Sequence, residues 1–333
     1  MNLNSSKFGV LLSYAHVKQT INKVRSAKSN PGTMRWGWTP EALAWLFANP
    51  NVDILIDCGA FTFAKRGIQI AVGEYMSFID EYLPKIWGYF ALDVIKDPMQ
   101  SRKNLQAMWK TEHRPIPIHV AGEEQSWMDE CFKHSPLVAI ASGVRNREDW
   151  DPPSWFAMKT RWAKGRPVHW LGYCDIGLAQ TVKPYSVDSS SWMQSARFGV
   201  AMVYLGNGRR IPIEARNLRK GILTKKNISQ KELMRAVTAA GCAFSDFINP
   251  DKWKGAYDSN PAVLVSTYGW VQYIREIQER FGVRWFLSLG HLGPWCAVLM
   301  RAIERVDKTC IQYATGHDYK QFLGQPILER GMK

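Results

Sequence analysis

Four polar residues share one kind of position, the end of a short apolar run. Asp57 ends DILID, Asp93 ends YFALD, His119 ends PIPIH and Asp188 ends YSVD. If the runs are parallel strands, their carboxyl ends meet at one edge of the sheet and the four side chains converge. Two converging carboxylates suit chemistry at an anomeric carbon, because one can attack the carbon while the other carries a proton to and from the leaving group.

Each of these residues also has a structural explanation. Asp188 is followed by three serines, and Asp-Ser-Ser is ordinary chemistry for a helix N-cap. Phe61 lies four residues after Asp57 and could stack on a planar ligand, although a place in the hydrophobic core explains the same spacing. The convergence of four polar residues, rather than any one of them, therefore carries the prediction.

Glycines at two further run ends leave room for a flat ligand. Ser142 and Gly143 end one run, and Gly172 and Tyr173 end another. Glycine has no Cβ, so a planar ring can approach the backbone N–H and C=O groups at these positions. We include these residues in the predicted pocket.

Eight short apolar runs are available to position these side chains. They span residues 8–17, 52–60, 88–95, 115–122, 137–144, 167–174, 184–188 and 285–290. Helical patterns between the runs are typical of parallel βα units, and eight strands close a TIM barrel. We predict an α/β fold of this class, a TIM (β/α)8 barrel, with an open doubly wound sheet as the alternative.

The interval between the seventh and eighth runs is too long for one helical crossover. We predict that residues 198–284 form an insertion beside the barrel mouth. It begins as a hairpin whose Gly-Asn-Gly turn spans residues 206–208, and helical patterns follow at 229–241 and 261–281. The whole chain, 1–333, is interpreted as a single catalytic barrel domain, with a small separate domain at the insertion as the alternative.

The chain is strongly basic, with a formal net charge of +14. Such a charge favours a polyanionic partner, although a simply basic surface is the alternative. Within the predicted insertion, eighteen residues contain seven basic side chains and one acid, Glu214, which is typical of a stripe that contacts phosphates. The basic residues are Arg209, Arg210, Arg216, Arg219, Lys220, Lys225 and Lys226.

Composition excludes a disordered chain, because 46% of the residues are hydrophobic and 12% are aromatic. No segment approaches the ~20 apolar residues of a membrane span and no signal-peptide run is visible, so we expect a cytoplasmic protein without membrane contact. The six cysteines form no CxxC pair. We expect no cofactor and no metal; Cys296, Cys310, His291 and His317 are the candidates for a zinc site, but their spacing matches no standard pattern.

Taken together, the motifs resemble a known family. DCGAF at 57–61 looks like the DSGGF-type motif of the tRNA-guanine transglycosylases, the queuine and archaeosine base-exchange enzymes. Further segments are similar, in the same order along the chain, to five other stretches of the family. FALDVI at 90–95 resembles the substrate-recognition Asp segment, IHVAGE at 118–123 the VQGG segment and IASGV at 140–144 the GGL segment. WLGYCD at 170–175 resembles the LMG-V-G segment, and VDSSSWMQSARFG at 187–199 resembles FDC…TRxARxG. The order and approximate spacing hold from about residue 50 to residue 200.

The resemblance implies a role for each matching residue. Asp188 would be the nucleophile and Asp57 the general acid/base, while Asp93 would hydrogen-bond a guanine-like base and Phe61 would stack on it. His119 stands where the family usually has Gln. The remaining matches would line the pocket or contact nucleic acid: Ser142, Gly143, Leu171, Gly172 and Tyr173 in the pocket, and Arg197 on the nucleic acid.

The departures from the family indicate one of its branches. The CxCxxC…H zinc module that helps to engage tRNA is absent from the sequence, and Cys58 stands where Ser is usual. The combination looks like the DNA-modifying branch of phages and bacterial genomic islands, which inserts 7-deazaguanines such as preQ0 into DNA. The resemblance thus implies DNA and a free 7-deazaguanine as partners, a covalent aspartyl-glycosyl intermediate, and action in a bacterial or phage-infected cytoplasm.

Three other functions remain as alternatives. The same base exchange could take place on tRNA. A retaining glycosidase or nucleoside-processing barrel would use the acid pair on a small substrate. A non-catalytic nucleic-acid-binding protein would need the acids only for its structure. The oligomeric state is left open.

Overall fold

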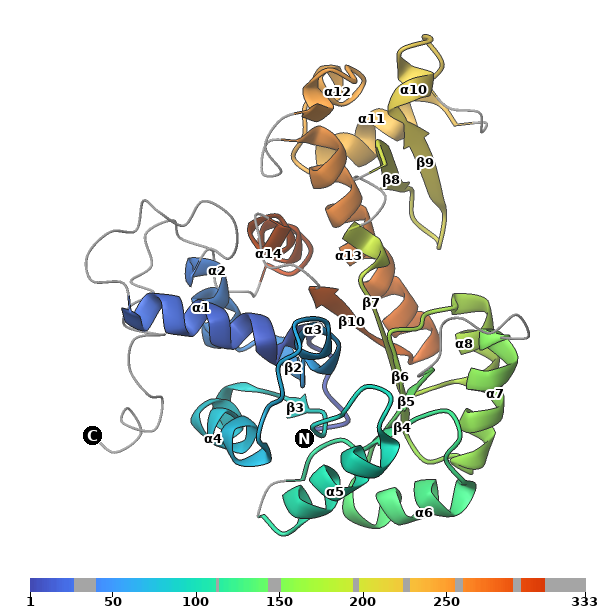
Figure 1. Ribbon diagram of the computed structural model, residues 1–333. Coiled ribbons are helices and arrows are strands. Elements are labelled where there is room, and N and C mark those ends of the chain that lie inside the picture. Colours follow the sequence, from blue (N-terminus) through green and yellow to red (C-terminus); the bar gives the residue numbers. More distant parts are fainter. Residues whose placement is uncertain are drawn as a thin grey trace.

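The described part of the chain is an α/β structure built on one large sheet (Figure 1). The computed structural model describes residues 1–26, 40–111, 114–142, 151–193, 198–223, 228–254, 260–289 and 295–308. Among these residues, eight strands form a parallel sheet in the order β3-β2-β1-β10-β7-β6-β5-β4. The strands are β1 (Phe8–Ser13), β2 (Val52–Asp57), β3 (Gly88–Tyr89), β4 (Ile118–His119), β5 (Val138–Ala141), β6 (Val168–Leu171), β7 (Ser186–Ser189) and β10 (Arg284–Leu289).

Every strand of this sheet lies within one of the eight apolar runs or extends beyond it by at most one residue, so the predicted βα series is confirmed at this level. The sheet is curled into a half-barrel that is consistent with a TIM-like barrel. β10 pairs with both β7 and β1 and so connects the last strands to the first. Within the described residues, one parallel bridge between Phe90 and Ile116 joins the segments beside the edge strands β3 and β4.

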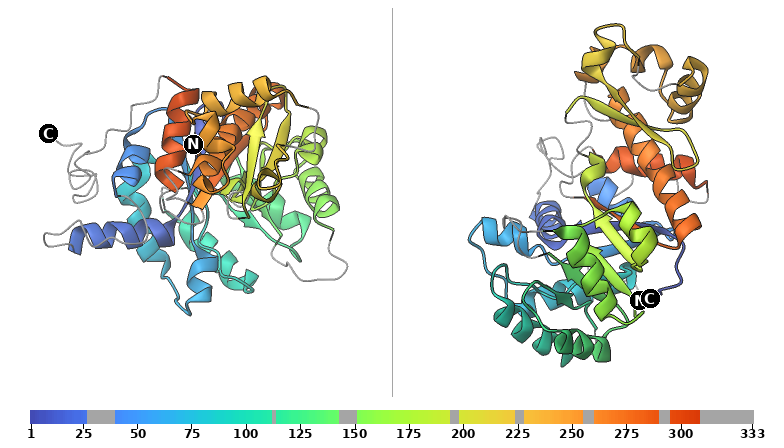
Figure 2. Two further views of the ribbon diagram at one scale, coloured as in Figure 1. Left: turned by 90° about the horizontal axis from the view of Figure 1, so that it is seen from above. Right: turned by 90° about the vertical axis from the view of Figure 1, so that its right-hand side faces the viewer.

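Helices follow most of the strands and cover the outer face of the sheet (Figure 2). They are α1 (Tyr14–Ser26), α2 (Pro40–Ala48), α3 (Ala60–Lys65), α4 (Val72–Tyr82), α5 (Pro98–Trp109), α6 (Gln125–His134), α7 (Pro152–Trp162), α8 (Ile176–Val182), α13 (Pro261–Phe281) and α14 (Trp295–Val306). α5 begins where the sequence predicts, because Asp97 Oδ1 accepts a hydrogen bond from the Gln100 N–H at 2.9 Å and Pro98 follows the cap. Among the described helices, none is long and apolar enough to cross a membrane.

Side chains of the sheet alternate between its two faces. Leu11, Leu55 and Phe286 belong to a small apolar core inside the curl. Their chain neighbours, such as Ile54 and Leu287, belong to the main hydrophobic core between the sheet and the helices. Because successive residues of a strand point to opposite faces, this alternation decides which polar side chains reach the interior.

The first part of the predicted insertion, called the insertion unit below, has a hydrophobic core of its own. β8 (Val200–Tyr204) and β9 (Arg210–Glu214) form the predicted antiparallel hairpin. Three helices accompany it: α10 (Ala215–Leu218), α11 (Gln230–Ala239) and α12 (Phe244–Phe247). The unit stands at the top of Figure 1 and of the right-hand view in Figure 2, on the side where β7 ends.

α13 connects this unit to the sheet because it contributes to both cores. Ala262 and Val265, near its start, lie in the core of the insertion unit. Val271, Ile274 and Ile277, further along, lie in the main core. One helix of 21 residues within the predicted insertion therefore packs in both cores.

A buried ion pair lies at the amino-terminal end of the sheet, opposite the predicted mouth. The Arg284 guanidinium donates hydrogen bonds to Asp53 Oδ2 and to the Lys7 carbonyl oxygen. The guanidinium carbon lies 4.8 Å from the Trp87 ring centroid and 4.7 Å from that of Phe286. The charge of Arg284 is therefore neutralised within an otherwise aromatic environment.

We expect Asp53→Ala to lower the free energy of unfolding by about 3–5 kcal/mol, because it leaves the buried Arg284 charge without its carboxylate. Urea denaturation followed by tryptophan fluorescence measures the change. Asp251→Ala, which removes one partner of the exposed Lys254–Asp251 pair, serves as the control. Equal unfolding midpoints for the two variants would contradict a stabilising role for Asp53.

Candidate active site

Asp57 lies at the carboxyl end of β2, where the chain turns into α3. Its Oδ2 accepts a hydrogen bond from the Gly59 N–H at 3.0 Å. Gly59 has a φ of 78°, and a Cβ at this position would lie 3.0 Å from the Ala15 backbone nitrogen, so the turn requires glycine. α3 starts at the next residue and leaves 68% of Phe61 exposed. Phe61 is therefore available to a ligand rather than part of the core.

The environment of Asp57 favours its protonated form. Burial of the carboxyl group raises its pKa from 3.8 to about 7; repulsion from the carboxylates of Asp188 and Asp93 acts in the same direction, while the Gly59 hydrogen bond opposes it. Asp188 and Asp93 therefore both lie close enough to Asp57 to act on its charge. A carboxyl group with a pKa of about 7 exists in both protonation states near neutral pH, which suits general acid/base catalysis.

Asp188, on β7, has a different environment. It is 3% exposed, and its Oδ1 accepts a hydrogen bond of 2.6 Å from the Gly172 N–H. His169 Nε2 lies 3.2 Å from the same oxygen. Within the described residues both contacts involve Oδ1, so that Oδ2 is left for a substrate. The carboxylate is thus held by donors in a fixed orientation.

His169 belongs to a buried polar column that the sequence interpretation did not include. It is paired in register with Ser186 on the neighbouring strand, and its Nδ1 lies 2.8 Å from the Ser186 Oγ. A hydrogen bond from Nε2 to the Asp188 carboxylate leaves Nδ1 of a neutral ring to accept the hydroxyl proton of Ser186. His169 occupies an inward-facing position in an apolar run, which is the sequence signal that could have identified it.

The order Ser186–His169–Asp188 resembles a hydrolase triad but cannot work as one. Ser186 and His169 are both fully buried, inside the sheet and further from its carboxyl edge than Asp188. The rings of Phe90 and Phe286 lie against His169, with centroids 5.2 Å and 6.0 Å from the imidazole. A nucleophilic serine must meet its substrate, and the member of this column that lies nearest the carboxyl edge of the sheet is the aspartate.

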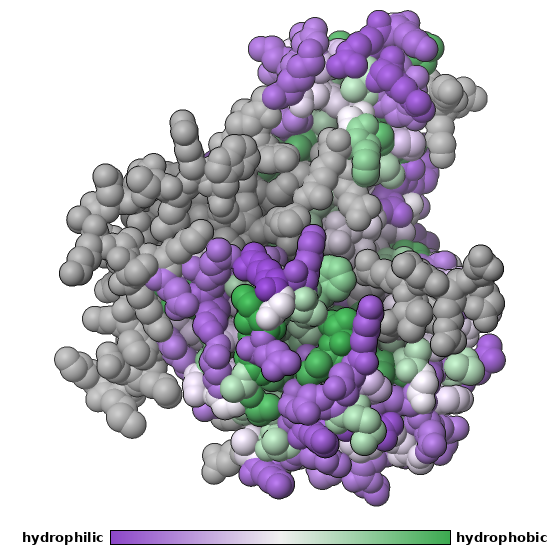
Figure 3. Space-filling model, in the orientation of Figure 1, coloured by the Kyte–Doolittle hydropathy of each residue, from purple (hydrophilic) through white to green (hydrophobic). Residues whose placement is uncertain are grey.

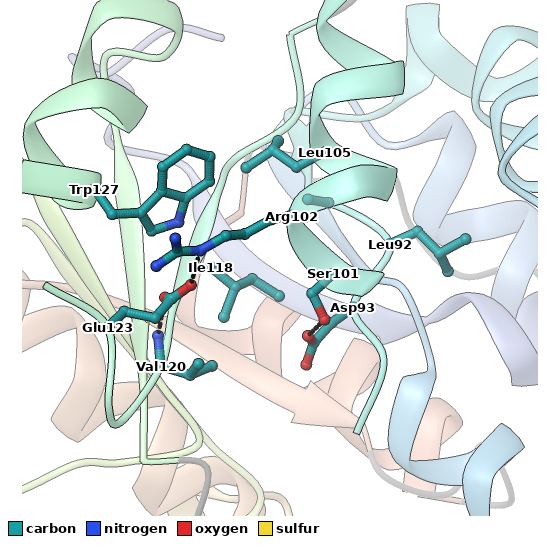
Figure 4. Close-up of a pocket in the computed structure, with 10 residues that line it drawn as sticks. Leu92, Asp93, Ser101, Arg102, Leu105, Ile118, Val120, Glu123 and Trp127 are labelled. Atoms are coloured by element: carbon teal, nitrogen blue, oxygen red, sulfur yellow. Dashed lines mark hydrogen bonds and ion pairs between the residues drawn. The ribbon is translucent and has the colours of Figure 1, made fainter. Parts of the chain in front are cut away.

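Asp93 lines a narrow pocket between the segment after β3 and the segment after β4 (Figure 4). Burial raises the pKa of Asp93, while a hydrogen bond of 2.6 Å from the Ser101 hydroxyl to its Oδ1 opposes the shift. The cavity has a volume of about 10 Å³, which holds about one water molecule. A planar base could therefore meet Asp93 only at the open mouth above this pocket, or after the pocket widens.

A hydrogen-bond network fixes the wall of this pocket opposite Asp93. Glu123 is almost fully buried; its Oε2 accepts from the Val120 N–H at 2.8 Å and its Oε1 from Arg102 Nε at 3.0 Å (Figure 4). The buried Lys159 ammonium donates to the Glu123 carbonyl oxygen at 2.9 Å. The turn after β4 is thereby held from three sides, which makes this wall rigid.

His119 does not lie at the mouth, which corrects the prediction from its place at the end of a run. It pairs with Ile140, whose side chain faces the helices, and it is fully buried beside Trp162 at a centroid distance of 6.1 Å. Its Nε2 lies 3.0 Å from the Glu124 carbonyl oxygen. Burial lowers the pKa of His119 to about 4, so the ring is neutral. His119 supports the turn rather than the ligand.

The other predicted pocket residues are divided between the mouth and the outer layers. Gly172 contributes the N–H that binds Asp188, and Leu171, before it, lies against the inner core. Tyr173 stacks on Phe156 of α7 at 4.2 Å, which directs it toward the helix layer. Ser142 is partly exposed at the end of β5. Gly143 lies outside the described residues.

The predicted basic stripe separates into structural and exposed residues. The Arg210 guanidinium lies 3.7 Å from the Tyr273 ring centroid and 4.4 Å from that of Trp270, and it fastens the hairpin to α13. Arg209 pairs with Glu232 at 3.2 Å. The remaining described members are exposed: Arg216, Arg219 and Lys220. Arg197, Lys225 and Lys226 lie outside the described residues.

The structure does not test the suggested zinc ligands. His291, Cys310 and His317 lie outside the described residues, as does the side chain of Cys296. Elsewhere in the described ranges, no group of three His, Cys, Asp or Glu side chains is arranged to hold a metal ion.

No protein-family model, curated protein or solved structure matches this chain.

We expect His169→Leu to lower the free energy of unfolding by about 1–3 kcal/mol, because it leaves the buried Ser186 hydroxyl without an acceptor and takes one donor from Asp188. His169→Gln is the matched control, since its side-chain amide can replace the Nε2 donor. Chemical denaturation of both variants measures the difference. A leucine variant as stable as the wild type would show that the column does not contribute to stability.

Proposed function

We propose that this chain is a base-exchange transglycosylase that replaces guanine in DNA with a 7-deazaguanine. The observation that carries the proposal is the unequal environment of two converging carboxyl groups. The pKa of Asp57 is raised to about 7, whereas Asp188 is held by two donors on Oδ1. Two acids with different environments can divide the roles of proton carrier and nucleophile.

In the first step Asp188 is the nucleophile. Its Oδ2 attacks C1′ of the target nucleotide, and the C1′–N9 bond breaks with its electron pair moving onto guanine. Protonated Asp57 donates its proton to the leaving base. The products are an ester between Asp188 and the deoxyribose, free guanine, and the carboxylate form of Asp57.

The second step reverses the first with another base. A free 7-deazaguanine enters the site, Asp57 takes the proton from its N9, and N9 attacks C1′. The ester breaks, its electron pair returns to Asp188, and Asp57 is protonated for the next cycle. The exchange needs no oxidant or reductant, because every bond and proton is replaced within the cycle.

The basic surface supports a nucleic-acid substrate over a small glycoside. The net charge is +14, and Arg216, Arg219 and Lys220 are exposed on the insertion unit, on the side of the sheet where β7 ends. A glycosidase acting on a small sugar has no use for these charges. DNA is preferred over tRNA on the sequence resemblance alone, and tRNA remains the alternative substrate.

The finer architecture is part of the same proposal: we infer a closed (β/α)8 barrel. The sheet order follows the chain order through β7 and continues to β10 and β1. Between the edge strands, Ala91 N donates to the Ile116 carbonyl at 2.9 Å, and Ile116 N donates to the Tyr89 carbonyl at 2.8 Å. These hydrogen bonds support closure, with the active site at the carboxyl edge of the strands.

Base exchange is tested by incubating the protein with DNA or tRNA and labelled preQ0, digesting the nucleic acid to nucleosides and identifying the labelled product by mass. We expect label in the DNA pool, and no label above background with Asp188→Asn, which lacks the nucleophilic carboxylate. Asp246→Asn, the same substitution on the exposed surface of the insertion unit, should retain the wild-type yield. Label in neither pool with wild-type protein would refute the reaction with this base.

The pH dependence of the first step tests the role of Asp57. Because its pKa is raised to about 7, the protonated form required to expel guanine is present below that pH and is lost as the pH rises through it. In single-turnover experiments without added base, we expect the rate of guanine release to fall about tenfold per pH unit above pH ~7. Asp57→Asn should release guanine slowly and without this dependence. A wild-type rate that rises through this range would contradict the assignment.

A further inference from the structure

One aromatic residue of the insertion unit is unusually exposed. Phe198, just before β8, has 79% of its surface open to solvent. The next residue is tied to the far end of the hairpin, because the Gly199 carbonyl accepts a hydrogen bond of 2.9 Å from the Ala215 N–H. Gly199 itself has a φ of 66°. Phe198 is thus held next to the start of α10 by an ordered backbone.

The turn beside Phe198 carries three cations. Arg216 lies in α10, and Arg219 and Lys220 directly follow its last residue, Leu218. The turn is closed by backbone hydrogen bonds, from Arg219 N to the Ala215 carbonyl at 3.1 Å and from Lys220 N to the Asn217 carbonyl at 2.9 Å. All three cations are exposed.

The acids near these cations do not neutralise the surface. Arg216 is bonded to Glu214, but 76% of its side chain is open to solvent, where such a pair is readily exchanged for a phosphate. Arg219 interacts electrostatically with Asp251, which is itself bonded to Lys254. Within the described residues, Lys220 has no ion-pair partner. The surface therefore keeps a positive charge beside an exposed aromatic ring (Figure 3 shows the mainly hydrophilic face of this unit at the top).

We propose that Phe198, Arg216, Arg219 and Lys220 form a platform that binds unpaired nucleotides, with Phe198 stacking on a base and the cations on the neighbouring phosphates. A paired duplex presents phosphates to such a surface and keeps its bases stacked internally, so that it would satisfy the cations and leave the ring exposed. A single strand contacts both the cations and the ring, since every base has a face on which an aromatic side chain can stack.

This platform deepens the proposed function, on which its biological use depends. Base exchange requires the target nucleotide to leave the duplex, and that opening exposes unpaired bases on either side of it. A platform that prefers unpaired nucleotides would stabilise the opened strand while the target base occupies the mouth. The two parts are connected along the chain, because residues 190–197 lead from β7 to Phe198.

The test is equilibrium binding of wild-type protein to fluorescein-labelled oligo-dT, measured by fluorescence anisotropy without added base. Oligo-dT contains no guanine, so no exchange can occur and the result does not depend on the chemistry. We expect the single strand to bind more tightly than a dA·dT duplex of the same length at the same salt concentration. Phe198→Ala should weaken binding to oligo-dT by about 5- to 150-fold and leave duplex binding unchanged.

Three variants make the test specific. Phe198→Trp should restore single-strand affinity, because it preserves stacking. The Arg219→Ala/Lys220→Ala double variant should weaken both ligands and reduce the salt slope for oligo-dT by about 1.4, or 0.7 for each lost phosphate contact. Met234→Ala removes another exposed apolar side chain of the insertion unit (42% exposed) and should bind like the wild type.

Two results would overturn the platform: equal affinity of wild-type protein for duplex and single strand, or unchanged oligo-dT affinity in Phe198→Ala. Either would leave base exchange standing if labelled preQ0 still enters guanine-containing DNA. Conversely, Phe198-dependent binding of oligo-dT without any exchange would support the platform and reject the reaction.

Discussion

The alternation of side chains along parallel strands is the constraint on which the site depends. In a curled parallel sheet, a residue faces either the interior or the helices, and moving by one position changes the side. His169 and Ser186 lie at the same level on neighbouring strands and both face inward, so they meet; Asp188 lies two residues beyond Ser186 and also faces inward. His119 lies on the opposite face, toward the helices, and so does not reach the mouth. The position of each residue along its strand therefore decides whether its side chain reaches the interior.

The same arrangement gives the two carboxyl groups different properties. Asp188 receives a backbone N–H and an imidazole, which stabilise a negative charge in a buried place. Among the described residues, Asp57 receives hydrogen bonds from the backbone only, and repulsion from Asp188 and Asp93 adds to the effect of its burial. An ionised Asp188 therefore helps to keep Asp57 protonated. The pKa of Asp57 therefore depends in part on its two acidic neighbours.

Sequence predicted the elements better than the contacts between them. The eight strands, the hairpin and the start of α5 follow from apolar runs, turn residues and caps, which are local signals. The convergence of Asp57, Asp93 and Asp188 also follows, because equivalent strand ends must meet. The error at His119 has a physical cause: a β4 of two residues gives too short a pattern to indicate which face a side chain occupies.

The remaining misses are effects of long-range packing. Arg210 looks like its neighbours in sequence, yet it lies against Tyr273 and Trp270 from a helix some sixty residues later. His169 was hidden within an apolar run, and only its partner on the next strand shows its purpose. The inward-facing position of His169 marks the residue itself, but the partner in each of these contacts lies far along the chain and cannot be read from composition or periodicity.

The shared helix α13 has a consequence for how a bound strand would be positioned. Because one continuous helix belongs to both hydrophobic cores, and Arg210 fastens the hairpin to it, the insertion unit is not an arm on a flexible tether. The unit is joined to the sheet through packed helix contacts. Under the proposed function, the separation between the exposed turn of α10 and the carboxyl end of β7 would set the number of nucleotides between a strand bound at that turn and the nucleotide presented to Asp188.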